Sequence, residues 1–327
     1  MTKNKEPAGE PGQKTIVLVS PHGFCAGVRR AIDIVEAALD QLPHPIYCLR
    51  EIVHNRQVVD GLRRKGVIFV NDLADVPPTS TLLFSAHGVT PQVRSKAGER
   101  RFNVIDATCP FVAKVHTEVR KYASLDYTII LIGFRKHDEV VGVVGEAPSH
   151  VVVAENADEA ARLSVKDPEK IAVITQTTLS ADETSKVHTV LKSRFPKLVT
   201  PAQSDICYAT TNRQNAVMAL ADRVRTILVL GSRNSSNSNR LVEVARTRGA
   251  AVHLIDSMPD LDTVPLDGLD EIGLTAGAST PDSFIREVTA QLKRLGYARI
   301  EVMQVATENI HFPLPPQLKR IDNTGTL

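Results

Sequence analysis

Short runs of β-branched residues alternate with amphipathic stretches along almost the whole chain. A parallel pair of strands needs a crossover connection, usually a helix, so this alternation is typical of α/β proteins with parallel sheets. The sequence therefore predicts the α/β fold class. The expected strands are Thr15–Ser20, Thr81–Ser85, Val104–Ala107, Tyr127–Gly133, Ile171–Thr175, Thr226–Gly231 and Glu271–Ala276, and the expected helices are Val28–Leu42, Val112–Ala123, Thr211–Val224, Arg240–Arg248 and Ser283–Leu295.

The length and charge of the chain limit the classes of protein to which it can belong. The chain has 327 residues, enough for two or three domains, with a net charge of +2, 4% aromatic residues and no Trp. A nucleic-acid-binding protein normally shows a basic face or stacking aromatics, so we expect no nucleic-acid partner. The longest apolar runs, such as Tyr127–Ile132, have strand length and not membrane-span length, so we also expect no membrane partner.

The first fourteen residues are polar and contain Pro, Gly and charges of both signs. They have no apolar core of signal-peptide length, so the segment 1–14 is predicted to be a disordered leader. We therefore predict a cytoplasmic protein, in which thiols stay reduced and four cysteines are ligands, nucleophiles or core residues rather than disulfides.

A weak internal repeat is the most informative feature of the sequence. In three places a cysteine lies between a predicted strand and a predicted helix, and a second and a third polar loop follow each cysteine. The first member of the second loop comes 29, 28 and 28 residues after the cysteine. This order predicts three similar α/β domains, 15–100, 101–195 and 196–298, with a strand and tail at 299–327 that return to the first domain. The three sets are Cys25, His54 and His87; Cys109, His137 and Thr177; and Cys207, Ser235 and Ser279.

The loops of such a repeat have a physical reason to meet. Ligands of open parallel sheets bind beyond the carboxyl ends of the strands, where the following helices begin. Free N–H groups and the positive end of the helix dipole favour thiolates and phosphates at these positions. We therefore expect the loops to converge on one centre.

Spacing alone leaves the role of the cysteines open. Cys25, Cys109 and Cys207 are separated by 84 and 98 residues, unlike the close pairs of zinc knuckles or ferredoxins. They are either ligands of a metal or cluster, or unrelated buried thiols, and the repeat favours the first reading. Three thiolates on a cubane cluster would leave one iron open to a substrate oxygen. Cys48 lies in a strand-like run and is predicted to be a core residue.

The polar loops predict an anion site. A single histidine at a strand–helix junction is more often structural, but His54, His87 and His137 occupy equivalent loops. The tract Asn234–Asn237 adds hydroxyl and amide donors at a helix start, although an ordinary N-cap would explain one or two of them. Glu139 is a candidate proton donor or an exposed helix-start carboxylate. The chain has neither a G-x-G-x-x-G motif nor a P-loop, so nucleotide binding is not predicted.

Taken together, these motifs resemble those of the 4-hydroxy-3-methylbut-2-enyl diphosphate reductase family, which catalyses the last step of the non-mevalonate isoprenoid pathway. The resemblance covers the chain from about Val19 to Asp282. Its matching segments are GFCAGVRRAI, EIVHNRQVVD, SAHGV, DATCPFV, TQTTLS, DICYATTNRQ, SRNSSNSNRL and TAGASTPD.

The resemblance implies a [4Fe–4S] cluster on Cys25, Cys109 and Cys207, with three α/β domains in pseudo-threefold arrangement around it. It implies reductive dehydroxylation to isopentenyl and dimethylallyl diphosphates, with electrons from a ferredoxin or flavodoxin-type donor. Glu139 would give the proton with the help of Thr177. The implied substrate-binding residues are His54, His87, His137, Thr177, Ser235, Ser236, Asn237 and Ser279.

One loop departs from the family pattern. The family usually reads close to G-H-x-G-H-P-E, whereas this chain has Phe134, Lys136 and Asp138 in place of a His, the Gly and the Pro. His137 and Glu139 remain in place, so the departure concerns the backbone and charge of the loop.

Two rival functions stay open at this point. A [4Fe–4S] hydro-lyase also uses an open iron but needs no electrons, and the expected diphosphate cradle argues against it. A cluster-based redox sensor without enzymatic activity would need a partner surface or a DNA-binding module, and the near-neutral charge gives no sign of one.

Overall fold

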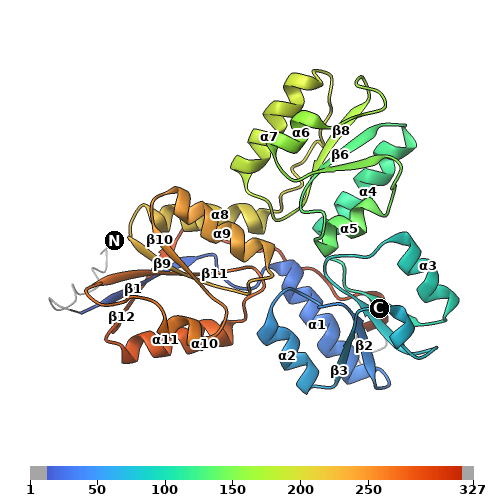
Figure 1. Ribbon diagram of the computed structural model, residues 1–327. Helices are drawn as coiled ribbons and strands as arrows, with labels where there is room; N and C mark the ends of the chain where they lie inside the picture. Colours follow the sequence, from blue (N-terminus) through green and yellow to red (C-terminus); the bar gives the residue numbers. More distant parts are fainter. Residues whose placement is uncertain (1–12, 319–327) are drawn as a thin grey trace, which may run out of the picture. The chain divides into compact units, whose positions relative to one another are not determined.

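The computed structural model describes residues 13–318 and confirms the α/β class: in this range all the paired strands of its three sheets run parallel. The chain divides into two units (Figure 1). The first unit takes in Phe24 and the described residues before it, together with Asn212–Glu308. The second unit takes in Cys25–Thr211, together with Asn309 and the described residues after it.

The first unit holds a five-stranded sheet covered on both faces. The strands alternate hydrophobic residues toward both sides, as sheets with two helical layers require. Ile16 and Leu274 pack with Phe284 and Val288 on the face toward α10 (Met258–Asp262) and α11 (Asp282–Arg294). Val17, on the opposite face, packs with helices α8 (Tyr208–Ala221) and α9 (Ser236–Thr247). The strands in order across the sheet are β10 (Ala251–Ile255), β9 (Thr226–Leu230), β11 (Glu271–Ala276), β1 (Thr15–Ser20) and β12 (Arg299–Gln304).

The second unit holds two smaller parallel sheets. Their strands end at the loops that carry five of the predicted site residues: His54, His87, Cys109, His137 and Thr177. The first sheet has the order β3 (Val67–Val70), β2 (Ile46–Leu49), β4 (Thr81–Phe84), β5 (Asn103–Asp106), and the second has the order β7 (Val151–Ala154), β6 (Thr128–Ile132), β8 (Ile171–Thr175). The helices are α1 (Ala26–Gln41), α2 (Arg56–Arg64), α3 (Pro91–Glu99), α4 (Pro110–Ser124), α5 (Asp138–Val144), α6 (Ala157–Arg162) and α7 (Ala181–Arg194), with short 3-10 turns at Leu73–Asp75 and Pro316–Leu318.

Side-chain caps explain where many of these helices begin. Asn55, Thr90 and Ser180 each accept a hydrogen bond from the backbone N–H three residues ahead, which satisfies a donor that has no partner inside the helix. α4 instead has Pro110 at its first position, where a missing N–H costs nothing. The polar residues at strand–helix junctions therefore cap helices, in addition to any functional role.

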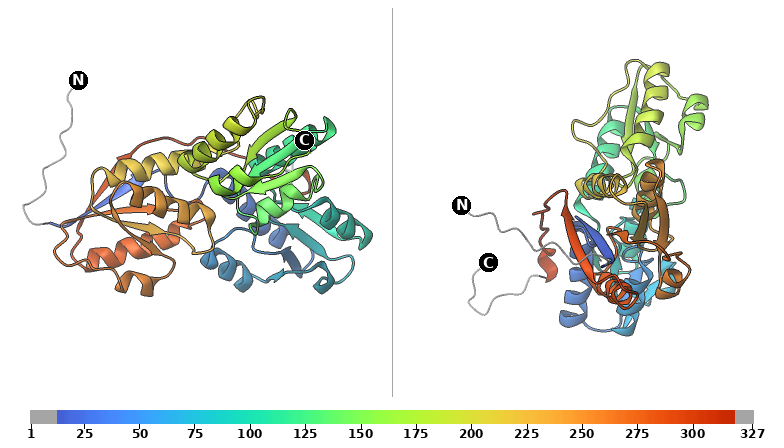
Figure 2. Two further views of the ribbon diagram at one scale, coloured as in Figure 1. Left: turned by 45° about the horizontal axis from the view of Figure 1, so that its top comes forward. Right: turned by 90° about the vertical axis from the view of Figure 1, so that its left-hand side faces the viewer.

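The elements expected from the sequence all occur, with boundaries shifted by a few residues. The expected helix 240–248 begins earlier, at Ser236, because Ser235 caps it. β1 pairs with β11 and β12, so the strand that precedes Cys25 shares its sheet with the strand predicted to return near the C-terminus (Figure 2). The three domain boundaries stay a prediction. The predicted leader lies, up to residue 12, outside the described residues.

No helix within residues 13–318 is long and apolar enough to cross a membrane.

Gly273 on β11 sits where α8 comes closest to the sheet. A Cβ atom there would lie 2.7 Å from Val224 Cγ2 and 2.9 Å from Leu220 Cδ2. Gly273→Ala should lower the free energy of unfolding by about 1–3 kcal/mol, the usual cost of overpacking a core. The matched control is Gly98→Ala in α3, where a Cβ would meet nothing within 4 Å; it should raise the stability by up to about 1 kcal/mol. Chemical denaturation of both variants checks this, and equal shifts in the same direction would contradict it.

Candidate active site

Each of the three predicted cluster cysteines stands immediately before a helix. Cys25 is the N-cap of α1, Cys109 is the N-cap of α4, and Cys207 directly precedes α8. The Cys25 Sγ atom accepts a hydrogen bond from the backbone N–H of Val28 at 3.5 Å. The Cys207 Sγ atom lies 3.2 Å from the Thr210 hydroxyl. A helix N-terminus favours the thiolate form, which is the form that binds metals.

The three sulfur atoms also affect one another. The pKa of the Cys109 thiol is raised to about 12, chiefly by burial and further by the nearby sulfur atoms of Cys25 and Cys207. Burial raises the pKa of Cys207 to about 11, Cys25 adds to this rise, and the hydrogen bond with Thr210 opposes it. The structure therefore brings the three predicted cysteines into electrostatic range of one another. Cys48 lies fully buried in β2, as a core residue does.

Gly27 allows two of these thiols to come together. A Cβ atom on Gly27 would lie 2.6 Å from the Cys109 Sγ atom and 3.9 Å from the Cys25 Sγ atom. Arg30, one turn further along α1, donates from Nη1 to the Thr108 carbonyl oxygen at 3.1 Å. The Cys109 N–H in turn donates to the carbonyl oxygen of Ala86, in the loop that follows β4, at 3.0 Å.

Three histidine rings from three loops form a second cluster in the same unit. The rings of His54 and His87 stack with centroids 4.0 Å apart and planes 19° from parallel. His137 meets both edge-on, at 5.1 Å from His54 and 5.6 Å from His87. His54 precedes the N-cap of α2, His87 follows β4, and His137 is the N-cap of α5, where its Nδ1 accepts the Glu139 N–H at 3.2 Å.

The environment keeps two of these rings, those of His87 and His137, neutral. Burial lowers the pKa of His87 well below its usual value, and His54, His137 and Arg50 lower it further. Burial, followed by the effect of His54, lowers the pKa of His137 to about 4. An anion placed among the rings would reverse this balance, because a negative charge favours the protonated imidazolium. The cluster is therefore suited to take up an anion together with protons.

Glu139 is a buried carboxylic acid held by a single residue. Glu139 is only 2% exposed, and its carboxyl oxygens accept hydrogen bonds from the Thr177 N–H at 2.7 Å and the Thr177 hydroxyl at 2.9 Å. Burial raises its pKa to about 7; the Thr177 hydrogen bonds oppose this rise, and Asp205 adds to it. The Thr177 carbonyl oxygen also accepts the Cys207 N–H at 3.1 Å. Thr177 therefore links the acid to the backbone of a predicted cluster cysteine.

The polar residues of the first unit form a cluster of their own. Asn237, near the start of α9, is 5% exposed and accepts the Ala278 N–H at 2.8 Å through its Oδ1 atom. This contact joins the first turn of α9 to the loop after β11, which carries the buried Ser279. The Asn237 Nδ2 atom is buried and has no hydrogen-bond partner among the residues that the structure describes. Ser235 caps the helix by accepting the Ser238 N–H at 3.3 Å, and Ser236 follows it.

The departing loop has a contact that the sequence did not predict. Asp138 is the first residue of α5, where an acidic side chain complements the helix dipole. Its carboxylate pairs with the guanidinium of Arg50, which follows β2. Phe134 packs against the core beneath β6 and β8, and its N–H donates to the Gln176 side chain at 3.0 Å. Glu139 thus keeps its helical position despite the altered loop.

Other residues near the site escaped the sequence analysis. Asp205 is buried, accepts the Thr175 N–H at 3.0 Å, and pairs with Lys114 at 2.7 Å. Its position two residues before Cys207 was the only signal available. His116 was given no function, yet it is buried beside Glu146 at 2.7 Å, and a Cβ on Gly88 would lie 2.9 Å from its Nε2 atom.

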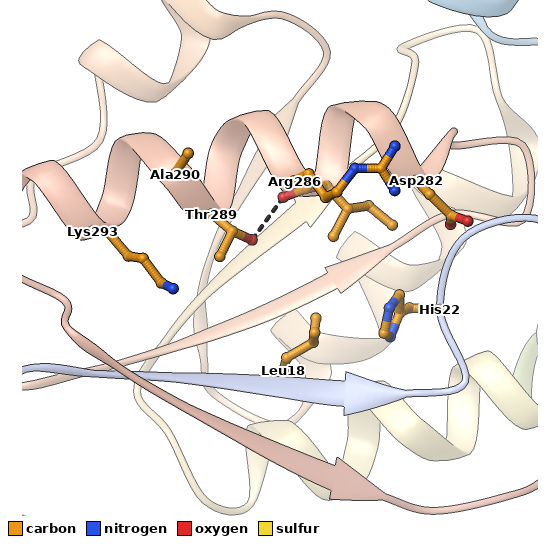
Figure 3. Close-up of a pocket in the computed structure, with 8 residues that line it drawn as sticks. Leu18, His22, Asp282, Arg286, Thr289, Ala290 and Lys293 are labelled. Atoms are coloured by element: carbon orange, nitrogen blue, oxygen red, sulfur yellow. Dashed lines mark hydrogen bonds between the residues drawn. The ribbon is translucent and has the colours of Figure 1, made fainter.

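A cavity of about 420 Å³ lies elsewhere in the first unit, between β1 and α11 (Figure 3). Leu18 and Ile285 contribute apolar surface to it, and His22, Arg286 and Lys293 contribute polar groups. None of the predicted site residues lines this cavity.

The fold and these clusters define an α/β enzyme with thiols, imidazoles and a buried acid at the carboxyl ends of parallel strands. A family model described as LytB protein matches residues 16–293. The chain belongs to this family.

Relatives with established names agree with this assignment. The chain is 48% identical over 313 residues to a 4-hydroxy-3-methylbut-2-enyl diphosphate reductase of Neisseria meningitidis, covering 95% of this chain and 97% of the relative. It is also 48% identical over 313 residues to a 4-hydroxy-3-methylbut-2-enyl diphosphate reductase 1 of Mycobacterium bovis, covering 95% of this chain and 93% of the relative.

A solved structure agrees as well. The E-1-hydroxy-2-methyl-but-2-enyl-4-diphosphate reductase of Plasmodium falciparum superposes with a TM-score of 0.90 at 38% identity, covering 94% of this chain and 97% of that one. The resemblance stated from the motifs is confirmed, and the chain is an oxidoreductase.

Thr177→Val should raise the pKa of Glu139 above its value of about 7. The substitution removes the hydroxyl that donates to Glu139 Oε2, and a hydrogen bond to a carboxylate favours the ionised form. Infrared spectroscopy of the carboxylic C=O stretch as a function of pH measures the shift. Thr178→Val, one position along the loop, is the control and should leave this titration in place. A lower pKa in the Thr177 variant would contradict the assignment.

Proposed function

We propose that this chain reduces 4-hydroxy-3-methylbut-2-enyl diphosphate to isopentenyl diphosphate and dimethylallyl diphosphate. The single observation that carries this proposal is Glu139, a buried acid with a pKa of about 7 that Thr177 ties to the loop of Cys207. Removal of a hydroxyl group as water needs such an acid close to the reducing centre. The relatives that carry this name support the substrate.

Cys25, Cys109 and Cys207 are the proposed ligands of a [4Fe–4S] cluster. The donor set fits, because thiolates are the usual ligands of such clusters and a nearby cation would reverse the raised pKa values of Cys109 and Cys207. A cluster bound by these three residues would supply the electrons and an iron open to the hydroxyl oxygen. Gly27 supports the proposal, since any side chain there would fill the space beside two of the thiols.

The diphosphate is proposed to bind to two sets of residues. His54, His87 and His137 form the first, because their rings lie together and the neutral rings of His87 and His137 would gain protons when an anion approaches. The second set is Ser235, Ser236, Asn237 and Ser279, where the unpartnered, buried Asn237 Nδ2 atom offers a hydrogen bond at a helix start. A buried donor without a partner is costly in the free protein, and an anion would satisfy it.

The proton is proposed to come from Glu139. At pH 7 about half of these groups carry a proton, since their pKa is close to that pH. The Thr177 N–H and hydroxyl hold the two carboxyl oxygens and stabilise the carboxylate that remains after transfer. The bound diphosphate would add negative charge and raise the pKa further, so substrate binding itself would favour the protonated acid. Thr177 is thus proposed to orient the acid as well as to line the substrate site.

The reaction takes up two electrons and two protons. One proton leaves with the hydroxyl group as water, and the other ends on carbon. We propose a one-electron donor of ferredoxin or flavodoxin type as the partner that supplies the electrons. The cytoplasmic location stays a prediction.

Serine in place of Cys25, Cys109 or Cys207 should remove most of the bound iron and the reductase activity. A hydroxyl group is a poor replacement for a soft thiolate ligand. Cys48→Ala is the matched control and should keep its iron, because Cys48 is a fully buried residue of β2. Iron and sulfide analysis of anaerobically purified protein decides the matter; iron retained in all three serine variants would overturn the cluster assignment.

Glu139→Gln should lower turnover by about a hundred- to ten-thousand-fold, the usual contribution of a positioned acid. Glutamine keeps the shape of the side chain and can still accept the Thr177 N–H, while its NH2 group can donate to the Thr177 hydroxyl, but it gives up no proton. The kcat/KM of the unsubstituted enzyme should fall as the pH rises through about 7, because this ratio reports the free enzyme, whose Glu139 is protonated only below that value. The residual rate of the Gln variant should lack this fall.

Steady-state reduction with a reduced viologen dye, measured at several pH values, gives both results. Glu169→Gln, an exposed carboxylate paired with Lys197, is the control and should match the unsubstituted enzyme. Near-normal turnover in the Glu139 variant would show that another group supplies the proton.

A further inference from the structure

His54, His87 and Asp138 form a cluster with the composition of a metal site. Each offers one ligand atom, and these atoms all lie within 4.8 Å of one another. They come from three separate loops: His54 precedes α2, His87 follows β4, and Asp138 begins α5. The cluster shares no residue with the three cysteines.

Each of the two imidazoles is held by a second polar group, whereas Asp138 is paired with a cation that a metal ion would displace. Glu51 Oε2 lies 3.2 Å from His54 Nδ1, and Ser85 Oγ lies 3.4 Å from His87 Nδ1. Arg50 binds Asp138 through its Oδ1 atom. Histidines that bind metals commonly donate their other ring N–H to such a carboxylate or hydroxyl group, which sets the tautomer and the direction of the ring. The contacts thus assign Nε2 of both imidazoles and Oδ2 of Asp138 as the ligand atoms.

A carboxylate is out of place in a site that binds only an anion. The negative charge of Asp138 would repel a diphosphate bound to the neighbouring rings. Arg50 offsets part of this charge, but its side chain is 44% exposed, and an exposed pair contributes little. A divalent cation between the carboxylate and the rings would remove the repulsion.

We propose that His54, His87 and Asp138 bind a divalent transition-metal ion of the zinc type. Two imidazole nitrogens and one carboxylate oxygen are the donor set of open zinc sites, which keep a fourth position for water or another ligand. Magnesium and calcium prefer oxygen ligands throughout, so this set selects against them. Zinc–ligand distances are about 2.0–2.2 Å, so the side chains must close inward by small rotations when the ion binds.

This site has a consequence for catalysis that rests on the proposed function. The ion would use the same imidazole nitrogens that are proposed to bind the diphosphate. Zinc and a diphosphate held directly by these rings therefore exclude each other, and zinc would inhibit the reductase. The metal site itself does not depend on the reaction.

Equilibrium dialysis of the iron-loaded protein against zinc ions, without thiols or chelating buffer, tests the site. We expect one zinc per chain and an unchanged iron content, measured by mass spectrometry of the metals. Asp138→Asn keeps the shape of the side chain and should weaken zinc binding by at least about tenfold, as loss of a ligand or its support does.

Arg50→Met is the decisive partner variant. It removes the cation that competes for Asp138, so zinc should bind as tightly as before or more tightly. If Arg50→Met instead lost zinc like Asp138→Asn, the pair would merely organise the loop, and the proposal would fail. Unchanged zinc affinity in Asp138→Asn would overturn the proposal too. So would zinc that binds only as iron is lost, since that zinc would occupy the cysteines in place of the iron. Reductase activity of zinc-free protein is measured separately, so failure of the proposed function remains distinguishable.

Discussion

The centre of the second unit depends on the close approach of α1 to Cys109. Gly27 leaves out the one atom that would block it, since a Cβ there would come 2.6 Å from Cys109 Sγ, far inside van der Waals contact. Arg30 holds the same helix to the carbonyl of Thr108, so the approach is fixed at two neighbouring points of α1. Two helix N-termini therefore lie beside neighbouring thiols: α1 directs the Val28 N–H to Cys25, and α4 directs N–H groups of its first turn to Cys109. This arrangement concentrates positive dipole ends at a place where thiolates are needed.

The pKa of the buried acid Glu139 is set by effects that oppose one another. Burial alone would push the pKa of Glu139 upward, and the two hydrogen bonds from Thr177 bring it back toward neutrality. Asp205 tips the balance toward the protonated form, while Lys114 pairs with Asp205 and limits its charge. An acid with a pKa near the working pH can both hold and release a proton, which makes it effective in catalysis. The environment of one carboxyl group is thus set by residues from three other segments of the chain.

The sequence predicted the class of fold and most of the polar groups near the site, because both depend on local patterns. The alternation of strands and helices is local, and so is the placement of Cys25, His54 and Glu139 at strand–helix junctions. Contacts between segments that are distant in the chain could not be predicted from the sequence. The pairing of Asp138 with Arg50 joins residues 88 positions apart, and neither loop has a sequence motif that predicts it. Which strands pair with β1 likewise depends on packing across the sheet.

The altered loop shows how one substitution can be tolerated structurally and still change the chemistry. Proline and aspartate both suit the first position of a helix, proline through its fixed φ and aspartate through the dipole. α5 therefore begins at the same place, and His137 and Glu139 keep their positions. The carboxylate of Asp138 forms an ion pair with Arg50. The backbone of Arg50 has a φ of +61°, a conformation that is unfavourable for residues other than glycine. The strained conformation of Arg50 places its guanidinium on the Asp138 carboxylate, which is the position that the proposed zinc ion would take from it.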